Sequence, residues 1–502
     1  MSKLSKVLTR ASVGLEAPLV TIEVHISSGL PSFSIVGLPE GAVKESKDRV
    51  RSAIMNSNFK FPNGRITVSL APANLPKSGG RYDLPIALGV LLASKQLKPN
   101  IDISNFEFYA ELGLDGILRA TEGLLPAIVE AHKSNHFIVL PKGNIDQSTL
   151  VEGAQTYPSK HLLEVCGFLT GKNKIEASIP SVNESVSYDK DFAQVKGQYH
   201  AKRALEIAAA GGHNVLLIGP PGSGKTMLSE RLPSIMPPLS IDKALERASV
   251  YSVANKALTT EELKLRPFRS PHHSASAVAL VGGGTNPKPG EISLAHEGVL
   301  FLDELPEFPR HVLEVLRQPL ENGEVHLSRA QHQLTFPCNF QLIAAMNPCP
   351  CGHHGDGTDK CHCTDDQISK YFGKISGPLL DRIDMVLSVP PLPKETLLNQ
   401  NDKQANSSES IRHRVLTAYN RQLTRQGKSN DRLASDEIEK VVPLDQQQKQ
   451  LLEVFIDKFA LSARAYHRIL KVARTIADLD ESKTVDKAHL IEAIGYRLQN
   501  DT

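Results

Sequence analysis

Eight residues near the middle of the chain, Gly219-Pro220-Pro221-Gly222-Ser223-Gly224-Lys225-Thr226, directly follow the apolar run Val215-Leu216-Leu217-Ile218. A short apolar run bounded by turn residues is typical of a buried strand, and glycines in such a turn let backbone N–H groups point inward where a helix begins. No other feature constrains the fold as strongly, because it requires a strand, a tight loop and a helix in that order. We expect a parallel sheet covered by helices, in an α/β protein.

This loop predicts binding and hydrolysis of ATP. Its backbone would cradle the β- and γ-phosphates, and Lys225 adds a positive charge. A second strand-like run, 299–302, ends at Asp303 and Glu304. Thr226 and Asp303 are expected to hold Mg²⁺, and Glu304 to polarise the attacking water. A glycine-rich turn that matches by chance is the disfavoured alternative, because both halves lie in the strand-loop context that this chemistry needs.

Length and composition favour an ordinary soluble protein with several domains. The 502 residues correspond to roughly three domains of about 100 to 200 residues. The longest apolar runs fall short of the roughly 20 residues that cross a bilayer, and the first residues lack a secretory apolar segment. We therefore expect no membrane association and a cytoplasmic location. The formal charge of +2 neither supports nor excludes DNA as a partner.

The pattern along the chain predicts three domains. Residues 1–172 mix strand-like and helical stretches, as in an α+β domain, and 173–190 are polar enough to form a linker. Residues 191–390 alternate strands and helices around the P-loop. Residues 391–502 carry helical periodicity and are expected to form an all-helical lid.

Further motifs occur in a fixed order after the P-loop. They are Arg266-Pro267-Phe268-Arg269-Ser270-Pro271-His272-His273-Ser274, Gly290-Glu291-Ile292-Ser293-Leu294-Ala295-His296, Asn347-Pro348-Cys349-Pro350-Cys351-Gly352 and Ser462-Ala463-Arg464-Ala465. With these motifs the chain resembles AAA+ ATPases of the magnesium-chelatase-like branch, most closely the YifB/ComM family, over nearly its whole length. The resemblance implies a homo-oligomeric ring, and we expect this ring to be a hexamer.

The same resemblance assigns roles to three residues outside the loop. Asn347 corresponds to the sensor that reads the γ-phosphate beside the catalytic water. Arg382 corresponds to an arginine finger that reaches a neighbouring subunit's site, and the alternative is an ion pair with Asp381 or Asp384. Arg464 corresponds to the second sensor on the lid, and the alternative is a role in helix packing.

Two segments are candidates for contact with DNA. Residues 324–336 read as a hairpin with Arg329 near its turn. In related helicases such a hairpin projects into the ring channel, and the insertion 282–290, which carries Lys288, resembles a second channel loop. Positive charge there would grip a phosphate backbone without reading sequence. Ordinary solvated side chains are the alternative.

The resemblance thus implies an ATP-driven ring motor on single-stranded or branched DNA, similar to ComM-type branch-migration helicases that act in natural transformation. The alternative is an ATPase that remodels a protein partner, as in magnesium chelatase. Nucleotide motifs do not separate these two hypotheses, because both share the motor domain.

Four cysteines crowd into residues 349–363, at Cys349, Cys351, Cys361 and Cys363. Four thiolates this close can form a tetrahedral structural zinc site. His353, His354 or His362 could replace one thiolate, and free thiols in a loop are the other alternative. Cys166 and Cys338 are expected to be buried as small hydrophobes.

The first domain resembles the proteolytic domain of Lon proteases, through residues 74–84, 111–116 and 141–144. Such a site needs a serine nucleophile and a lysine base. Arg81 and a position near Ala127 take these two places, and the neighbours Lys77 and Ser78 are poorly placed to form a dyad. We expect no peptidase activity, and a partner-binding or DNA-guiding role instead.

Overall fold

The computed structural model describes residues 4–178, 188–256, 258–284, 287–329, 332–355, 360–392, 407–459 and 461–497. The chain forms two compact units. Unit 1 groups residues 1–185, 240–264 and 328–336, and unit 2 groups residues 186–239, 265–327 and 337–502. The domain boundaries expected from the sequence stay a prediction. None of the described helices is long and apolar enough to cross a bilayer.

Unit 1 is built on a seven-stranded sheet in the order β3-β4-β2-β1-β5-β8-β9. Its strands are β1 (Leu4–Arg10), β2 (Leu19–Ser27), β3 (Ser32–Val36), β4 (Arg65–Ala71), β5 (Phe106–Phe108), β8 (Phe137–Pro141) and β9 (Thr156–Ser159). The sheet is mixed, because β2 runs antiparallel to both β1 and β4 while the other neighbours are parallel. A short pair, β6 (Glu111–Leu112) and β7 (Leu118–Arg119), stands apart from the sheet.

The helices of unit 1 are α1 (Gly41–Asn56), α2 (Asp83–Ala93), α3 (Leu125–Lys133), α4 (Ile145–Ser148), α5 (Leu162–Leu169) and α8 (Ile241–Val253). The central one, α2, is apolar on all sides and buried at every position but Leu92, as expected for a helix enclosed in a core. It packs on β1 and β2, while α8 packs on α3.

Unit 2 is built on a five-stranded parallel sheet in the order β11-β14-β17-β10-β18. The strands are β10 (Val215–Ile218), β11 (Phe268–Arg269), β14 (Val299–Leu302), β17 (Gln341–Met346) and β18 (Met385–Ser388). Every residue of β14 and β17 is buried. Because the strands are parallel, the loops after β10, β14 and β17 leave the same edge of the sheet, where residues far apart in sequence meet.

Short helices follow most of these strands: α7 (Lys225–Ser229), α9 (Ala277–Val281), α10 (Glu291–Leu294), α11 (Arg310–Glu314), α12 (Arg317–Asn322), α13 (Asp365–Phe372) and α14 (Gly377–Leu380). Two further pairs of strands are β12 (Gly282–Gly283) with β13 (Lys288–Pro289), and β15 (Glu324–Arg329) with β16 (His332–Pro337). The second pair confirms the expected hairpin, whose turn, 330–331, lies outside the described residues.

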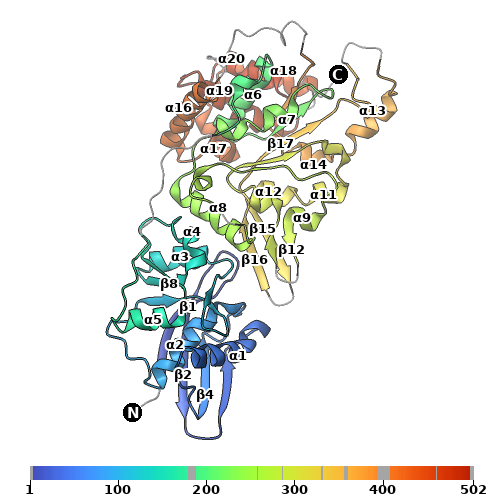
Figure 1. Cartoon of the computed structure of the whole chain (residues 1–502). Coiled ribbons are helices and arrows are strands. Elements are labelled where there is room, and N and C mark those ends of the chain that lie inside the picture. The colour runs from blue at the N-terminus through green and yellow to red at the C-terminus, as the bar shows by residue number, and fades with distance from the viewer. Residues whose placement is uncertain are drawn as a thin grey trace. The chain divides into compact units, whose positions relative to one another are not determined.

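The C-terminal part is helical, as expected. Its helices are α16 (Ser408–Gln426), α17 (Ser435–Val441), α18 (Gln446–Phe459), α19 (Ala463–Leu479) and α20 (Lys487–Gly495). Helix α6 (Tyr199–Gly211), which precedes the P-loop strand, packs against both α16 and α19 (Figure 1). Their buried side chains belong to the same hydrophobic core as the sheet. The lid helices are therefore packed onto the nucleotide-binding fold through α6.

Candidate active site

The P-loop connects β10 to α7. Gly222 and Gly224 have φ angles of +77° and +94°, which glycine adopts without strain. A Cβ on Gly219 would overlap the carbonyl oxygen of Val389, just after the neighbouring strand β18. Glycine is thus required by the backbone at these three positions, and the resulting loop leaves room for a phosphate to approach the main chain.

Lys225 is buried at the base of this loop. Its Nζ donates to the carbonyl oxygens of Gly219, at 2.6 Å, and Pro220, at 3.0 Å. It also lies 3.3 Å from Oδ1 of Asn347. Burial lowers the pKa of Lys225, against the opposing effect of nearby carboxylates. The structure therefore brings the P-loop lysine and the predicted sensor together, because β17 lies beside β10.

Thr226 and Asp303 meet across the loop. The Thr226 hydroxyl donates to Oδ2 of Asp303 at 2.9 Å, so two oxygens of the kind that Mg²⁺ prefers lie side by side. Ser223 Oγ is buried inside the loop and has no hydrogen-bond partner among the described residues. These donors and oxygens fit a magnesium triphosphate, in which the metal neutralises charge on the transferring phosphoryl group.

Glu304 follows Asp303 with a left-handed φ of +52°, and its side chain is 53% exposed. Its Oε2 lies 3.3 Å from Nδ1 of His273. His273 comes four residues after β11, the strand next to β14, so the sheet order brings it to Glu304. The sequence reasoning assigned no role to His273. The feature of the sequence that could have pointed to His273 is its position in the motif 266–274, just after a strand.

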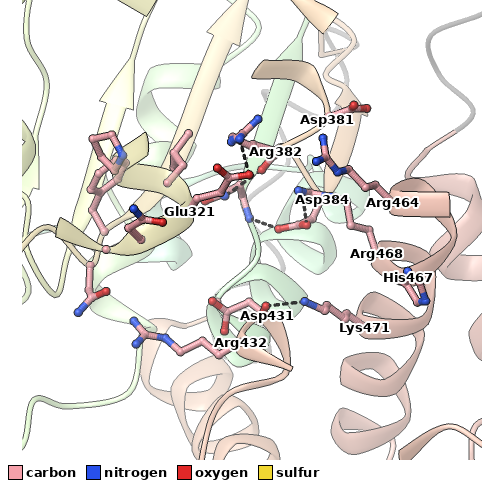
Figure 2. A pocket seen from close by; sticks show the side chains of 18 of the residues that line it. Glu321, Asp381, Arg382, Asp384, Asp431, Arg432, Arg464, His467, Arg468 and Lys471 are labelled. Atoms are coloured by element: carbon pink, nitrogen blue, oxygen red, sulfur yellow. Dashed lines mark hydrogen bonds and ion pairs between the residues drawn. The ribbon is translucent and has the colours of Figure 1, made fainter. Parts of the chain in front are cut away.

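A cavity of about 490 Å³ lies elsewhere in unit 2, between the sheet and the lid helices. Its charged lining consists of Glu321, Asp381, Arg382, Asp384, Asp431, Arg432, Arg464, Arg468 and Lys471. The predicted arginine finger, Arg382, and the predicted second sensor, Arg464, are both among these residues, whereas no residue of the P-loop is. Figure 2 shows Arg464 and Arg468 on one side of α19, while Arg382 lies beside Glu321.

Arg382 is buried in a network of its own. Its Nη2 forms an ion pair with Glu321 at 2.5 Å, and the carbonyl oxygens of Arg317 and Pro378 accept from its other nitrogens. The ion pair considered as an alternative is thus present with a different partner. Among the described residues Arg382 pairs with neither Asp381 nor Asp384, and the latter pairs with Arg468 at 2.7 Å. No motif or periodicity in the sequence pointed to Glu321.

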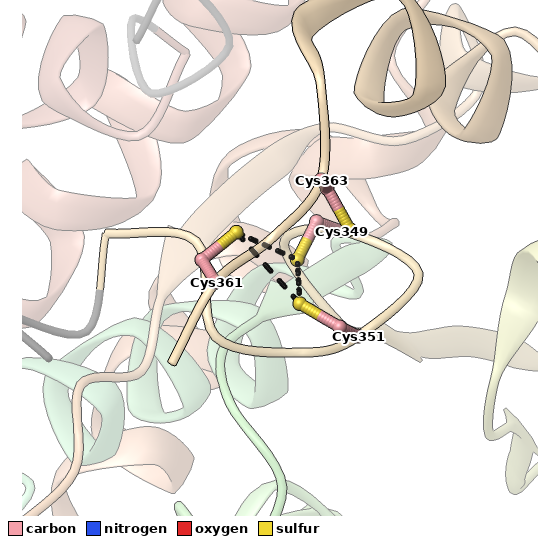
Figure 3. A group of neighbouring side chains, drawn as sticks. All are labelled: Cys349, Cys351, Cys361 and Cys363. Carbon is pink, nitrogen blue, oxygen red and sulfur yellow. Dashed lines mark hydrogen bonds between the residues drawn. The ribbon is translucent and has the colours of Figure 1, made fainter. Parts of the chain in front are cut away.

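The four clustered cysteines converge as expected (Figure 3). Their Sγ atoms all lie within 4.8 Å of one another. The distances from Cys349 to Cys351 and Cys361 are 3.3 and 3.8 Å, and that from Cys351 to Cys361 is 3.7 Å. A tetrahedron of sulfurs about 2.3 Å from a central zinc ion has edges of about 3.8 Å. The chemistry and spacing of this donor set therefore fit zinc.

The histidines near this cluster do not join its ligand set among the described residues. His354 contributes its backbone N–H, which donates to Cys349 Sγ at 3.3 Å. The other two cysteines, Cys166 and Cys338, are buried as expected, and burial raises the pKa of each thiol to about 12.

The candidate DNA contacts lie in the two hairpins. Lys288 is exposed in β13, whose pairing with β12 aligns it with Gly283. This pair of strands stands between α9 and α10, as expected for a loop that interrupts a helix. Arg329 is the last residue of β15, and its side chain lies outside the described part of the chain.

In unit 1, Arg81 occupies the place that the serine nucleophile of a Lon-type protease would take. Its guanidinium is buried and donates to the carbonyl oxygens of Glu122 and Gly123, at 2.7 and 3.3 Å. Lys77 is also buried, which lowers its pKa, and its Nζ donates to the Pro72 carbonyl. This contact of Lys77 does not involve Ser78.

Comparison with known proteins matches three stretches of the chain. The family of magnesium chelatase, subunit ChlI, matches residues 191–397; subunit ChlI of Mg-chelatase matches 22–144; and the subunit ChlI C-terminal family matches 405–497. Fold and site together thus define an AAA+ ATPase of the magnesium-chelatase type, with an N-terminal Lon-protease-like α+β part, a central parallel-sheet part and a helical lid.

Two relatives align over nearly the whole chain. Competence protein ComM of Haemophilus influenzae is 52% identical over 98% of this chain and 97% of its own length. The uncharacterized protein YifB of Escherichia coli is 49% identical over the same shares. Lon protease 2 of Bacillus subtilis is 25% identical over 32% of this chain and 33% of its own length. The chain belongs to the ComM/YifB family.

Proposed function

We propose that this ATPase is a ring motor that acts on DNA, a branch-migration helicase that supports recombination in natural transformation. The observation that carries the proposal is the match, over nearly the full length, to a protein named for competence. Competence is the capacity to take up DNA, and we therefore propose single-stranded or branched DNA as the substrate of this chain. We propose a cytoplasmic location, because ATP and DNA occur together there.

The cavity supports assembly into a ring, with six subunits as the proposed number. Arg382 and Arg464 line it together, and the P-loop of the same chain does not. A pair of guanidinium groups that serves no phosphate of its own chain is suited to serve a neighbour's. In this proposal Glu321 holds Arg382 until the γ-phosphate of the adjoining subunit competes for it.

The hairpins support a grip on DNA in the channel of such a ring. Lys288 is exposed, and Arg329 ends β15 next to the turn. Contacts of this kind bind phosphates, and their strength falls with salt. We propose that hydrolysis at Glu304, with Asn347 sensing the γ-phosphate, moves these hairpins along the DNA.

ATPase activity measured with and without single-stranded and branched DNA tests the proposal. DNA is expected to stimulate turnover, and Arg329→Ala to raise the DNA concentration for half-maximal stimulation about tenfold, with a smaller dependence on salt. Lys370→Ala is the matched control, because Lys370 is a surface lysine with 74% of its side chain exposed. DNA that neither binds nor stimulates would rule out the motor on DNA.

A protein-remodelling ATPase is the second candidate, favoured by the three matches to magnesium chelatase subunit ChlI. In that case the ring would change the shape of a partner protein, and ATP turnover would not respond to DNA.

We also propose that unit 1 has no peptidase activity, because the buried guanidinium of Arg81 fills the place of a nucleophile. Labelling of Ser78 by a serine-reactive probe in the native protein would contradict this.

We propose in addition that the four clustered cysteines bind one structural zinc ion. Their sulfur distances support a closed tetrahedral site without an open position for catalysis. About one equivalent of zinc per chain, measured in the purified protein and lost in a Cys361→Ser/Cys363→Ser variant, is the expected result.

A further inference from the structure

The zinc-type cluster lies in a loop that also touches the ATP site. The loop begins directly after β17, and Asn347 is its first residue. Asn347 Oδ1 lies 3.3 Å from Nζ of Lys225, and Cys349 follows two residues later. The cysteine cluster is therefore joined to the predicted sensor by a single intervening residue.

The chain that leaves the cluster returns to the same residue. After Cys363 it enters α13, where Tyr371 is buried. Burial raises the pKa of the Tyr371 phenol to about 12, and the nearby backbone N–H of Asn347 opposes this shift. One end of the loop is thus joined to Asn347 through the main chain, and the other end brings Tyr371 close to the same residue.

A second contact joins the loop to the P-loop itself. Gly352 has a φ angle of +85°, and a Cβ built on it would lie 2.7 Å from Cδ of Pro221 and 3.8 Å from Cγ of Asn347. Such a distance to Pro221 is too short for a real Cβ. Gly352 therefore packs its bare backbone directly against the P-loop, one residue after the ligand Cys351.

Little else in the loop fixes its shape. No helix or strand occurs among the described residues between the end of β17 and the start of α13. Of the four cysteines only Cys349 is buried, and Cys351 is exposed. A zinc ion held by the four cysteines would therefore supply much of the order of this loop, because metal binding and local folding are coupled.

We propose that zinc in the four-cysteine site controls the ATP site: the zinc-bound loop holds Pro221 and Asn347 in the positions that nucleotide binding requires, and loss of zinc releases both. This inference rests on the proposed zinc site and deepens the proposed ATPase. It assigns the cluster a positioning role, because none of its sulfurs contacts Lys225, Thr226 or Asp303 in the described structure.

The first test removes the metal from the full-length protein. Zinc content is measured before and after treatment with a chelator selective for zinc over magnesium, and nucleotide affinity is measured by titration with a fluorescent ADP analogue. The zinc-free protein is expected to keep its circular dichroism spectrum and to bind the analogue about tenfold more weakly, which is about 1.4 kcal/mol. One equivalent of Zn²⁺ is expected to restore the affinity.

The second test uses two glycines of the same loop. Gly352→Ala introduces a Cβ against Pro221, whereas Gly355→Ala, at a φ of +72°, meets no atom within 4 Å. Both variants carry the cost of a positive φ, so the contact with Pro221 is the difference between them. Gly352→Ala is expected to weaken nucleotide binding at least fivefold relative to Gly355→Ala, with equal zinc content.

The outcomes separate the two claims. Protein that contains no stoichiometric zinc contradicts the zinc site itself. Zinc-free protein that binds the analogue as tightly as the zinc-bound form contradicts the coupling and leaves the ATPase proposal intact. Equal affinities of the Gly352→Ala and Gly355→Ala variants contradict the contact with the P-loop as the route of coupling.

Discussion

Among single residues, the role proposed for Glu304, to polarise the attacking water, depends on the surroundings of its carboxylate. Its carboxylate is more than half exposed, and its Oε2 lies 3.3 Å from Nδ1 of His273. The His273 ring lies against His272, with ring centroids 4.0 Å apart, and meets the Phe308 ring edge-on. These contacts leave His273 few orientations and thereby restrict those of Glu304.

We predict that His273→Ala lowers the kcat for ATP about tenfold with little change in KM, because loss of one orienting polar contact, the 3.3 Å approach of Nδ1 to the carboxylate, costs about 1.4 kcal/mol in the transition state. His273→Asn is expected to recover most of the activity, since its amide nitrogen occupies nearly the place of Nδ1. His272→Ala should have a smaller effect than His273→Ala, because the Nδ1 of His272 contacts Ser274 and its ring reaches the carboxylate only through packing on His273. Equal losses in the Ala and Asn variants would contradict the prediction.

Two reference variants bracket this result. Lys225→Ala is expected to abolish nucleotide binding, whereas Glu304→Gln should bind ATP and retain it unhydrolysed. His273→Ala should fall between wild type and Glu304→Gln in steady-state turnover. Normal turnover in Glu304→Gln would remove Glu304 from its role and with it the reason to expect an effect at His273.

At the scale of elements, one buried histidine links the P-loop strand to the lid. His213 lies between α6 and β10, and its Nε2 is 2.7 Å from the Thr475 hydroxyl on α19. Burial lowers the pKa of His213 to about 4. The charged groups that face it are Asp384, at 3.9 Å, which raises the pKa, and Lys471 and Arg468, which lower it.

This environment predicts that acid weakens the packing of the lid. The folded pKa of His213 lies below the unfolded value, so its neutral form stabilises the fold above pH about 6.5, and that contribution is lost as the pH falls toward about 4. Between about pH 7.5 and about pH 5.5, the free energy of unfolding should fall by about 1 kcal/mol more in wild type than in His213→Gln. Urea unfolding at the two pH values measures the difference, and parallel pH profiles would contradict it.

The elements also show what sequence patterns can predict. The P-loop, the strand before Asp303 and the helical lid each have a local signature, namely apolar runs, fixed glycines and helical periodicity. The cysteine cluster was predictable because its members lie within one loop. The partners His273 and Glu321 were not, because each meets its site residue only through strand order or helix packing, which no local pattern encodes.

Within the chain, the residues proposed for one active site lie in two separate places. Its P-loop, magnesium-type oxygens and Glu304 occur together after β10 and β14, whereas Arg382 and Arg464 line a cavity without a P-loop residue. The cost of freeing Arg382 is limited, because its partner Glu321 is itself more than half exposed. A neighbour that presents its γ-phosphate to this cavity would complete the site.

Mixing two inactive variants tests this arrangement directly. Lys225→Ala and Arg382→Ala chains should each lack ATPase activity, whereas a mixture that assembles at random should have about one quarter of its sites complete, each with a lysine from one chain and an arginine from its neighbour. A mixture of Lys225→Ala with Glu304→Gln is the control and should stay inactive, because both changes affect the same side of the site. If Arg382 served its own chain, no mixture would recover activity, and measured turnover of the Lys225→Ala and Arg382→Ala mixture at the level of the control would show this.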